Sequence, residues 1–258
     1  MQSEINKKKL FLILMINRNS MGTPLTPYNS NESKKQQIAT MFNNVAGTYD
    51  FLNHFFSLGI DKLWRRKLIS LLRKSNPKQI LDVATGTADL AIAATTVNPE
   101  KISGVDISEK MLEVGKQKIK KYPNIDLQLA DGENLPFHDN TFDVVTIAFG
   151  IRNFENAIAG LGEMRRVLNV GGKIFVLEFS KPQNWFIKKL YYFYFCNVLP
   201  FVGKLVSKDD SAYSYLPESV RIFPDGKKFV ELLQYAGFKK IECKQLTFGI
   251  STIDIAEK

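Results

Sequence analysis

The chain has 258 residues and a formal net charge of +9 at pH 7. Its hydrophobic fraction of 45% and charged fraction of 24% are ordinary for a globular protein and exclude a disordered or fibrous chain. The length suffices for one α/β domain with a full core and is too short for two large domains. The positive charge suits either a nucleic acid or an anionic membrane surface as a partner, but no RRM, KH or zinc-finger pattern is present.

The cysteines and histidines form no pattern of metal ligands. The chain has only two histidines, His54 and His138, and its two cysteines, Cys196 and Cys243, lie far apart in the sequence. We therefore expect no bound metal. We also expect both thiols to be free and buried, in the reducing environment of the cytoplasm.

The N-terminal segment is not expected to belong to the fold. Lys7–Lys9 precede a short apolar run that is similar to the beginning of a signal peptide, but the run cannot span a bilayer and no small-residue cleavage site follows it. Residues 1–20 are therefore a disordered extension or an untranslated stretch, with a weak membrane anchor as the alternative. Residues 23–33 are rich in Pro, Asn and Ser, which is typical of a linker. We expect residues 1–33 to be extension and linker, and residues 34–258 to form a single domain.

Two helices are predicted at the beginning of this domain. Lys34–Phe42 has apolar residues on one helical face, and a second helix is expected from about Asp61 to Leu72. The segment between them is expected to be irregular.

The next segment has the pattern of a Rossmann-type nucleoside site. A short apolar strand, Ile80–Val83, ends in a tight turn at Gly86, a helix follows, and a second strand ends at Asp106. Glycine in this turn lets the backbone approach a ligand closely, and the acidic residue about 20 positions later accepts hydrogen bonds from ribose hydroxyls. A glycine turn that serves packing alone is the alternative.

The number of glycines distinguishes between nucleoside cofactors. A dinucleotide-binding turn uses three glycines to seat a pyrophosphate on a helix N-terminus, whereas the three places here are Ala84, Gly86 and Ala88. Asp82, at the end of the strand, would repel a phosphate but can pair with a cationic aminoacyl group. The pattern therefore indicates S-adenosyl-L-methionine rather than NAD.

A third and a fourth strand extend the same edge of the sheet. The third strand, Ile125–Ala130, is followed by Asp131, and the fourth is expected over Asp143–Phe149. Asp82, Asp106 and Asp131 thus follow or end three successive strands, at the edge where ligands bind in open α/β sheets.

The last third of the chain completes the α/β pattern. A helix over Asn156–Leu168, ended by the Gly171-Gly172 pair, leads into a strand over Lys173–Phe179. Further elements are predicted as a helix and two antiparallel strands: Lys227–Tyr235 (ending at Gly237), Lys239–Thr247 and Ser251–Glu257.

An aromatic segment interrupts this pattern. Trp185–Val206 is dense in aromatic residues, is broken by Asn197 and Pro200, and has too short an apolar run for a transmembrane helix. Either it is a core helix against the sheet, or it forms an apolar tunnel or interfacial face that accepts a lipid tail.

Several segments together resemble one enzyme family. These are DVATGTAD, GVDISEKML, LPFHDNTFDVVTIAFGIRN, RVLNVGGKIFVLEFSKP and SYLPESVRIFPD. They are similar to the class I methyltransferases that C-methylate quinone precursors, the demethylmenaquinone and 2-polyprenyl-6-methoxy-benzoquinol methyltransferases. The resemblance runs from about Lys35 to the C-terminus.

The resemblance implies a fold. It is a Rossmann-like α/β fold with a mostly parallel seven-stranded sheet, an antiparallel C-terminal hairpin and an N-terminal helical lid over residues 34–75. Residues 184–225 are then a substrate-side insertion.

The resemblance also implies site residues. Thr87, Asp106 and the Asp131-Gly132 pair are the implied cofactor contacts, beside Asp82 and Gly86 from the pattern above. Because the lid of such enzymes covers the cofactor, Tyr49, Asp50 and Asp61 are expected to face the site. A helix-capping or surface role is the alternative for each aspartate.

The chemistry of ring methylation points to one further residue. Ionising a ring hydroxyl raises carbanion character at the neighbouring carbon, so a cation that stabilises phenolate is expected nearby. Arg152 directly follows the fourth strand, and its guanidinium is always charged. We predict that Arg152 is catalytic, with Asn153, Tyr49 and Asp50 as further candidates; a surface salt bridge to Glu155 or Asp143 is the alternative for Arg152.

The predicted function is therefore an S-adenosylmethionine-dependent C-methyltransferase acting on a polyprenyl quinol, cytoplasmic and peripheral on the inner face of the plasma membrane. A methyltransferase for another lipophilic phenol or a sterol is the first alternative, and a non-catalytic nucleic-acid-binding Rossmann protein is the second. The sequence leaves open the ring type, the tail length, the general base and the oligomeric state.

Overall fold

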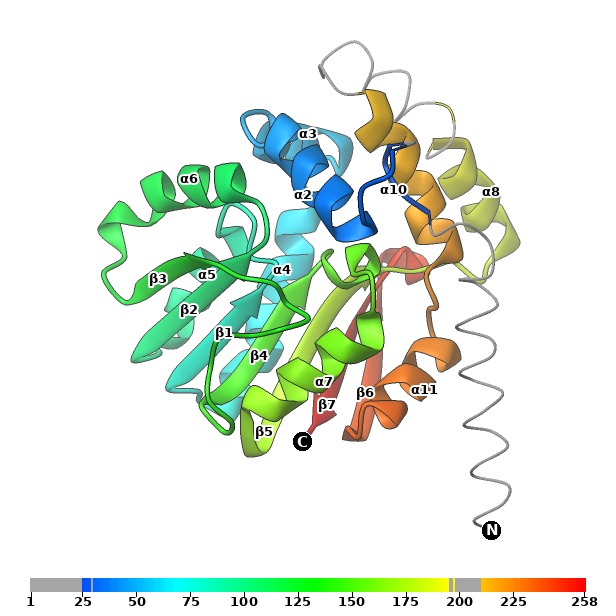
Figure 1. Cartoon of the computed structure of the whole chain (residues 1–258). Coiled ribbons are helices and arrows are strands. Elements are labelled where there is room, and N and C mark those ends of the chain that lie inside the picture. Colours follow the sequence, from blue (N-terminus) through cyan, green and yellow to red (C-terminus); the bar gives the residue numbers. More distant parts are fainter. Residues whose placement is uncertain (1–24, 29, 195–196, 198–209) are drawn as a thin grey trace.

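The structure is a computed structural model that describes residues 25–28, 30–194, 197 and 210–258. In this part of the chain a seven-stranded sheet has the order β3-β2-β1-β4-β5-β7-β6 (Figure 1). The first five strands pair in parallel, and β7 lies antiparallel between β5 and β6. The strands are β1 (Gln79–Val83), β2 (Lys101–Asp106), β3 (Ile125–Leu129), β4 (Phe142–Ala148), β5 (Leu168–Phe179), β6 (Lys239–Leu246) and β7 (Ser251–Glu257). The predicted Rossmann-like sheet with its antiparallel C-terminal hairpin is confirmed.

Both faces of the sheet are covered by helices. Three helices pack on one face: α4 (Ile60–Leu72), α5 (Asp89–Ala94) and α6 (Glu109–Lys118). Two pack on the other: α7 (Ala157–Val167) and α11 (Lys227–Tyr235). Successive residues of a strand point to opposite faces, so Ile80 and Val144 join the first layer while Leu81 and Val145 join the second. This double burial explains the continuous apolar runs of the central strands.

The structure differs from the sequence prediction at the beginning of β5. The helix ends at Val167 and the strand begins at once with Leu168, so the Gly171-Gly172 pair lies within β5 rather than before it. The second difference concerns Cys243 on the edge strand β6. Its side chain is exposed, so its predicted burial is wrong. Cys196 lies outside the described residues.

The N-terminal helices lie above the carboxyl ends of the strands (Figure 1). They are α2 (Lys34–Val45), which begins with a capping box on Ser33, and α3 (Tyr49–Phe56). The prediction of an irregular segment before α4 is therefore wrong over α3. Of the predicted linker, Leu25 and Tyr28 pack beside α2, and the Tyr28 backbone N–H donates to Gln37.

The predicted insertion provides two helices next to this lid. They are α8 (Trp185–Phe193) and α10 (Asp210–Ile222), and α10 packs on α2 through Tyr215. Residues 195–196 and 198–209 of the segment lie outside the described residues. Within the described part of the chain, no helix is both long and apolar enough to cross a bilayer.

Candidate active site

Two neighbouring cavities lie where the lid meets the carboxyl ends of the strands. The small cavity has a volume of about 70 Å³ and is lined by the loops after β1, β2, β3 and β4. The large cavity has a volume of about 540 Å³ and is enclosed by α2, α3, α4, α8 and α10. Four residues line both, namely Phe42, Tyr49, Phe149 and Asn153. The two cavities therefore meet at a shared wall.

The small cavity contains the predicted nucleoside-binding pair. Gly86 has a φ of +58°, which glycine adopts without strain. Its N–H donates to one carboxylate oxygen of Asp106 at 2.8 Å, and Ser108 N–H donates to the other at 2.8 Å. A carboxylate oxygen can accept more than one hydrogen bond, so Asp106 keeps capacity for ligand hydroxyls. Burial raises the pKa of Asp106 against the opposing effect of these N–H groups.

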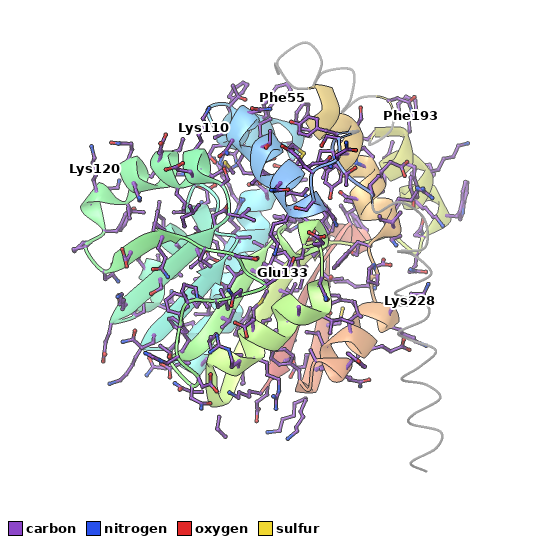
Figure 2. The ribbon with its side chains drawn as sticks, in the orientation of Figure 1. Phe55, Lys110, Lys120, Glu133, Phe193 and Lys228 are labelled. Atoms are coloured by element: carbon purple, nitrogen blue, oxygen red, sulfur yellow. The ribbon has the colours of Figure 1, made fainter. Side chains whose placement is uncertain are left out.

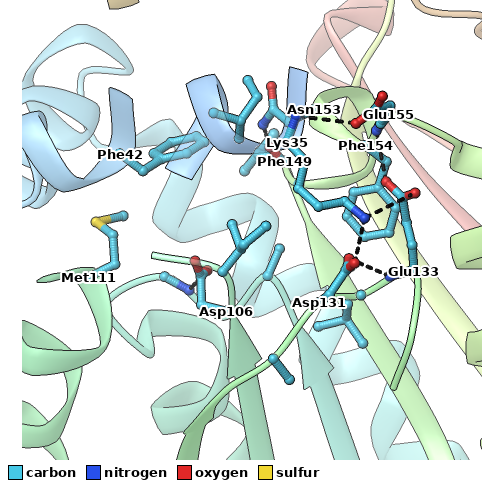
Figure 3. Close-up of a pocket in the computed structure, with 18 of the residues that line it drawn as sticks. Lys35, Phe42, Asp106, Met111, Asp131, Glu133, Phe149, Asn153, Phe154 and Glu155 are labelled. Atoms are coloured by element: carbon cyan, nitrogen blue, oxygen red, sulfur yellow. Dashed lines mark hydrogen bonds and ion pairs between the residues drawn. The ribbon is translucent and has the colours of Figure 1, made fainter. Parts of the chain in front are cut away.

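The loop after β3 forms the opposite side of the small cavity (Figure 3). Gly132 has no room for a side chain, because a Cβ there would lie 2.5 Å from the Phe154 ring. Asp131 is held by a residue of the lid, since Lys35 Nζ lies 2.5 Å from Asp131 and 3.6 Å from Glu133. The lid thus closes over the small cavity through an ion pair.

Asp82 lies beneath this cavity and does not line it. It is only 2% exposed, and its two oxygens accept hydrogen bonds from the hydroxyls of Thr85 and Thr146, each at 2.7 Å. Burial raises its pKa from 3.8 to about 6, although both hydroxyls oppose the shift. Asp82 therefore ties the strand ends β1 and β4 together, and its predicted contact with an aminoacyl group stays a prediction.

Asp50 and Thr87 come together, but outside both cavities. Thr87 donates to Asp50 at 2.6 Å, and Lys118 of α6 bridges Asp50 (2.7 Å), Thr87 (3.1 Å) and Asp89. This network joins α3 of the lid to the turn after β1. The geometry supports an anchoring role for both residues, and their predicted contacts with substrate and cofactor stay predictions.

The large cavity is mostly apolar, and the polar side chains on its lining include Ser57, Asp61 and Arg65 as well as a second group. This second group, here the polar wall, consists of Arg152, Asn153 and Tyr215, whose side chains are buried. Each has a buried polar atom without a hydrogen-bond partner among the described residues: Arg152 Nε, Asn153 Oδ1 and Tyr215 Oη. Buried polar atoms are normally paired, so this wall is suited to a ligand that carries polar groups.

Arg152 forms an ion pair in the interior rather than at the surface. Its Nη1 donates to Glu178 at 2.9 Å and to the Phe149 carbonyl, and the side chains of Arg152 and Glu178 are 8% and 3% exposed. The guanidinium also lies over the Phe179 ring, 5.5 Å from its centroid. The alternative of a surface salt bridge to Glu155 or Asp143 is therefore excluded. Burial raises the pKa of Glu178, while Arg152 opposes the shift.

Tyr49 stands at the junction of the two cavities. Its ring meets Phe42 edge-on at 5.9 Å, and Asn53 forms a hydrogen bond with its hydroxyl. Burial raises the pKa of this phenol above its usual value, although Asn53 and Arg152 oppose the shift, so the hydroxyl stays a hydrogen-bond donor at neutral pH. The position suits a residue that faces both cofactor and substrate.

Comparison with known proteins identifies the family to which this chain belongs. The model of the ubiE/COQ5 methyltransferase family matches residues 30–258. The chain belongs to this family. It is 46% identical over 238 residues to the demethylmenaquinone methyltransferase of Bacteroides fragilis, covering 91% of this chain and 97% of that protein. It is 45% identical over 230 residues to the ubiquinone/menaquinone biosynthesis C-methyltransferase UbiE of Geotalea uraniireducens, covering 87% and 97%.

Solved structures agree with the fold. A methyltransferase from Thermotoga maritima described as a possible histamine N-methyltransferase has a TM-score of 0.60 at 19% identity, covering 85% of this chain and 98% of that one. The [4+2]-cyclase SpnF reaches 0.62 at 16% identity, covering 87% and 96%. Since a cyclase shares the fold, the activity rests on the family and not on the architecture.

This family member is an S-adenosylmethionine-dependent methyltransferase, and the small cavity fits that cofactor. The buried Asp106 offers acceptors for ribose hydroxyls, and the backbone at Gly86 and Gly132 leaves room that side chains would fill.

Three residues of the site, Glu178, Tyr215 and Lys35, are not among those that the sequence patterns predict. Glu178 and Tyr215 lie in the quoted segments LEFSKP and SYLPESVRIFPD. The sequence signal for Glu178 is a carboxylate within an otherwise apolar strand, whereas no sequence pattern singles out Tyr215. Nothing in the sequence around Lys35 indicated a partner nearly a hundred residues away.

Proposed function

We propose that the enzyme methylates a ring carbon of a polyprenyl quinol, converting demethylmenaquinol to menaquinol, the methoxy-benzoquinol precursor of ubiquinone, or both. The observation that carries this proposal is the large apolar cavity with a buried guanidinium on one wall, next to the cofactor cavity. An isoprenoid tail needs the apolar lining, and an ionised ring hydroxyl needs the cation. The printed names of the relatives from Bacteroides fragilis and Geotalea uraniireducens support the same substrate class.

S-adenosylmethionine, when held by the residues of the small cavity, would supply an electrophilic methyl group. Phe42, Tyr49, Phe149 and Asn153 orient the ring at the shared wall and keep water away from the reacting carbon. Arg152 stabilises the phenolate beside that carbon through its guanidinium, which Glu178 holds in place. In the proposed displacement the ring carbon would bond to the methyl group as the methyl–sulfur bond breaks, leaving S-adenosylhomocysteine as a neutral thioether. The proton of that carbon then moves to the ring oxygen as the ring becomes aromatic again, so the net proton is the one released to solvent when the hydroxyl ionised.

We further propose that the enzyme works at the surface of an anionic membrane. Three residues that line the large cavity are also largely exposed at its rim: Leu58 (84%), Leu190 (59%) and Phe248 (78%). Other exposed apolar side chains lie on α3 and α8, two of the helices that enclose the cavity: Phe51, Phe55, Trp185, Phe186 and Phe193. Phe55 and Phe193 lie at the lid end of the molecule in Figure 2. Each CH₂ withdrawn from a bilayer costs about 0.8 kcal/mol, so a cavity that opens at the membrane keeps most of the tail in lipid.

The charges beside this rim match an anionic surface. Lys188 and Lys189 are exposed on α8, next to Trp185 and Phe186. Basic residues near such a surface contribute roughly 1 kcal/mol each. The double variant Lys188→Glu/Lys189→Glu should therefore bind phosphatidylserine vesicles at least tenfold more weakly, and salt should weaken wild-type binding.

Vesicle flotation measures this binding. For substitutions of exposed apolar residues, Val170→Ser is the matched control. Val170 is 87% exposed but lies on β5 away from the carboxyl ends of the strands. Leu58→Ser/Phe248→Ser should reduce flotation and raise KM for a tailed quinol more than for a tail-free analogue. Equal effects on both substrates, or equal loss in the Val170 variant, would assign these side chains no role at a membrane.

The proposed reaction itself is tested with the purified enzyme. Incubation with deuteriomethyl S-adenosylmethionine and a reduced demethylmenaquinone should add one labelled methyl group to the ring, detected by mass spectrometry. A parallel reaction with the methoxy-benzoquinol decides which ring type is accepted. Methylation of neither quinol would refute the proposed function.

A further inference from the structure

The polar wall of the large cavity contains more hydrogen-bonding capacity than one phenolate needs. A hydroquinol has two oxygens, one beside the reacting carbon (the near oxygen) and one across the ring (the far oxygen). Arg152 serves the near oxygen in the proposed function. The far oxygen would be buried in an apolar cavity, where an unpartnered hydroxyl is strongly disfavoured. The cavity therefore needs a second polar partner.

Tyr215 has the properties required of that partner. It is 5% exposed, lines the large cavity, and its hydroxyl has no hydrogen-bond partner among the described residues. Like Arg152, it lines the large cavity and not the small one. Arg152, however, is the chain neighbour of Asn153, which lines both cavities, whereas Tyr215 lies on the separate helix α10.

The ring of Tyr215 is fixed by its neighbours. It packs with Ile38 and Met41 of α2 in a small apolar cluster, so the hydroxyl is held by helices of the lid and of the insertion together. Burial raises its pKa to about 12, with Arg152 opposing and Glu178 adding to the shift. The hydroxyl stays protonated at neutral pH and can donate to a ring oxygen or accept from it.

We propose that the Tyr215 hydroxyl binds the far oxygen of the quinol ring, so that Tyr215 and Arg152 together fix the ring by its two oxygens. This inference rests on the proposed quinol substrate and adds a specificity residue to it. The consequence is orientation: with both oxygens held, one ring carbon is presented to the shared wall. A substrate without the far hydroxyl loses the contact and binds less tightly.

Tyr215→Phe is the test, because it removes one oxygen and keeps the ring that packs on α2. The matched control is Tyr122→Phe, which changes a half-buried tyrosine on the β3 side of the sheet. Two tail-free ligands are compared: a naphthalene-1,4-diol kept reduced, and the mono-hydroxy analogue without the far oxygen. Dissociation constants are measured by calorimetry with S-adenosylhomocysteine bound, and kcat/KM is measured by methyl transfer.

For the diol, we expect Tyr215→Phe to weaken binding and to lower kcat/KM by roughly tenfold, the value of a typical neutral hydrogen bond. For the mono-hydroxy analogue, wild type and variant should agree within about twofold. The Tm should stay level or rise, because a buried hydroxyl without a partner does not stabilise the free protein. Affinity for S-adenosylhomocysteine should not change.

Three results would overturn the inference: unchanged affinity for the diol, an equal loss for both ligands, or a fall in Tm that accounts for the lost activity. A wild-type enzyme that methylates no quinol would refute the proposed function instead. The calorimetric comparison still tests Tyr215 in that case, since it requires no turnover.

Discussion

The buried pair of Arg152 and Glu178 allows stability and catalysis to be separated. Replacing Arg152 by alanine leaves the Glu178 carboxylate, 3% exposed, without its partner. An unpaired charge in such a place costs about 3–5 kcal/mol. Loss of a preorganised cation that stabilises developing negative charge lowers the rate by about 10²–10³. Arg152→Ala should therefore lose both stability and turnover, and on its own it cannot tell a structural residue from a catalytic one.

The double variant Arg152→Met/Glu178→Gln makes that distinction. Both new side chains are neutral and similar in length to those they replace. The amide carbonyl introduced at position 178 can still accept the Phe179 N–H, which Glu178 accepts at 2.9 Å. Without a buried charge, most of the lost free energy of unfolding should return. The rate should remain about 10²–10³ below that of wild type, because the cation is still absent.

Urea denaturation and single-turnover methyl transfer are the two assays. Arg152→Lys is the companion variant: it keeps the charge but lacks the planar fork that serves Glu178 and the phenolate at once, so it should recover the rate only in part. If the double variant regains wild-type turnover together with its stability, Arg152 acts only as a partner of Glu178. The phenolate would then have to be stabilised from the lid.

Two further predictions concern the cofactor side. Asp82 has a folded-state pKa of about 6 against an ordinary 3.8, so the folded state binds the extra proton and stability should fall as pH rises from about 4 to about 6. Asp82→Asn should remove up to about 3 kcal/mol of this dependence, and denaturation curves with an unchanged dependence on pH would contradict it. Asp106→Ala should weaken S-adenosylmethionine binding at least tenfold, since charge-assisted hydrogen bonds contribute about 1.5–3 kcal/mol each. If calorimetry gives wild-type affinity for a folded Asp106→Ala variant, Asp106 does not bind the ribose hydroxyls of the cofactor.

The sheet and its functional edge were predictable because they depend on local patterns. The apolar strands that end at Val83 and Asp106 carry their own periodicity and turn signals, and the structure confirms both strands. Helix α3 was missed because its aromatic sequence, YDFLNHFF, has little helix propensity and is stabilised by the lid contacts. Packing against neighbouring elements, and not local propensity, makes this segment helical.

The partners of the site residues were not predictable in the same way. The contact of Asp50 with Thr87 spans 37 positions and that of Arg152 with Glu178 spans 26. Each depends on how separate elements dock, which periodicity does not encode. The unpartnered hydroxyl of Tyr215 is likewise a property of the assembled cavity.

The central claim is that this enzyme methylates a quinol in the cell. Mass spectrometry of the quinones from a strain that lacks the gene tests it most directly. We predict that a demethylated quinone accumulates, either demethylmenaquinone or the demethylated benzoquinol, and that the methylated product returns when the wild-type gene is restored but not when the Arg152→Met/Glu178→Gln variant is supplied. An unchanged quinone profile in the deletion strain would contradict the account.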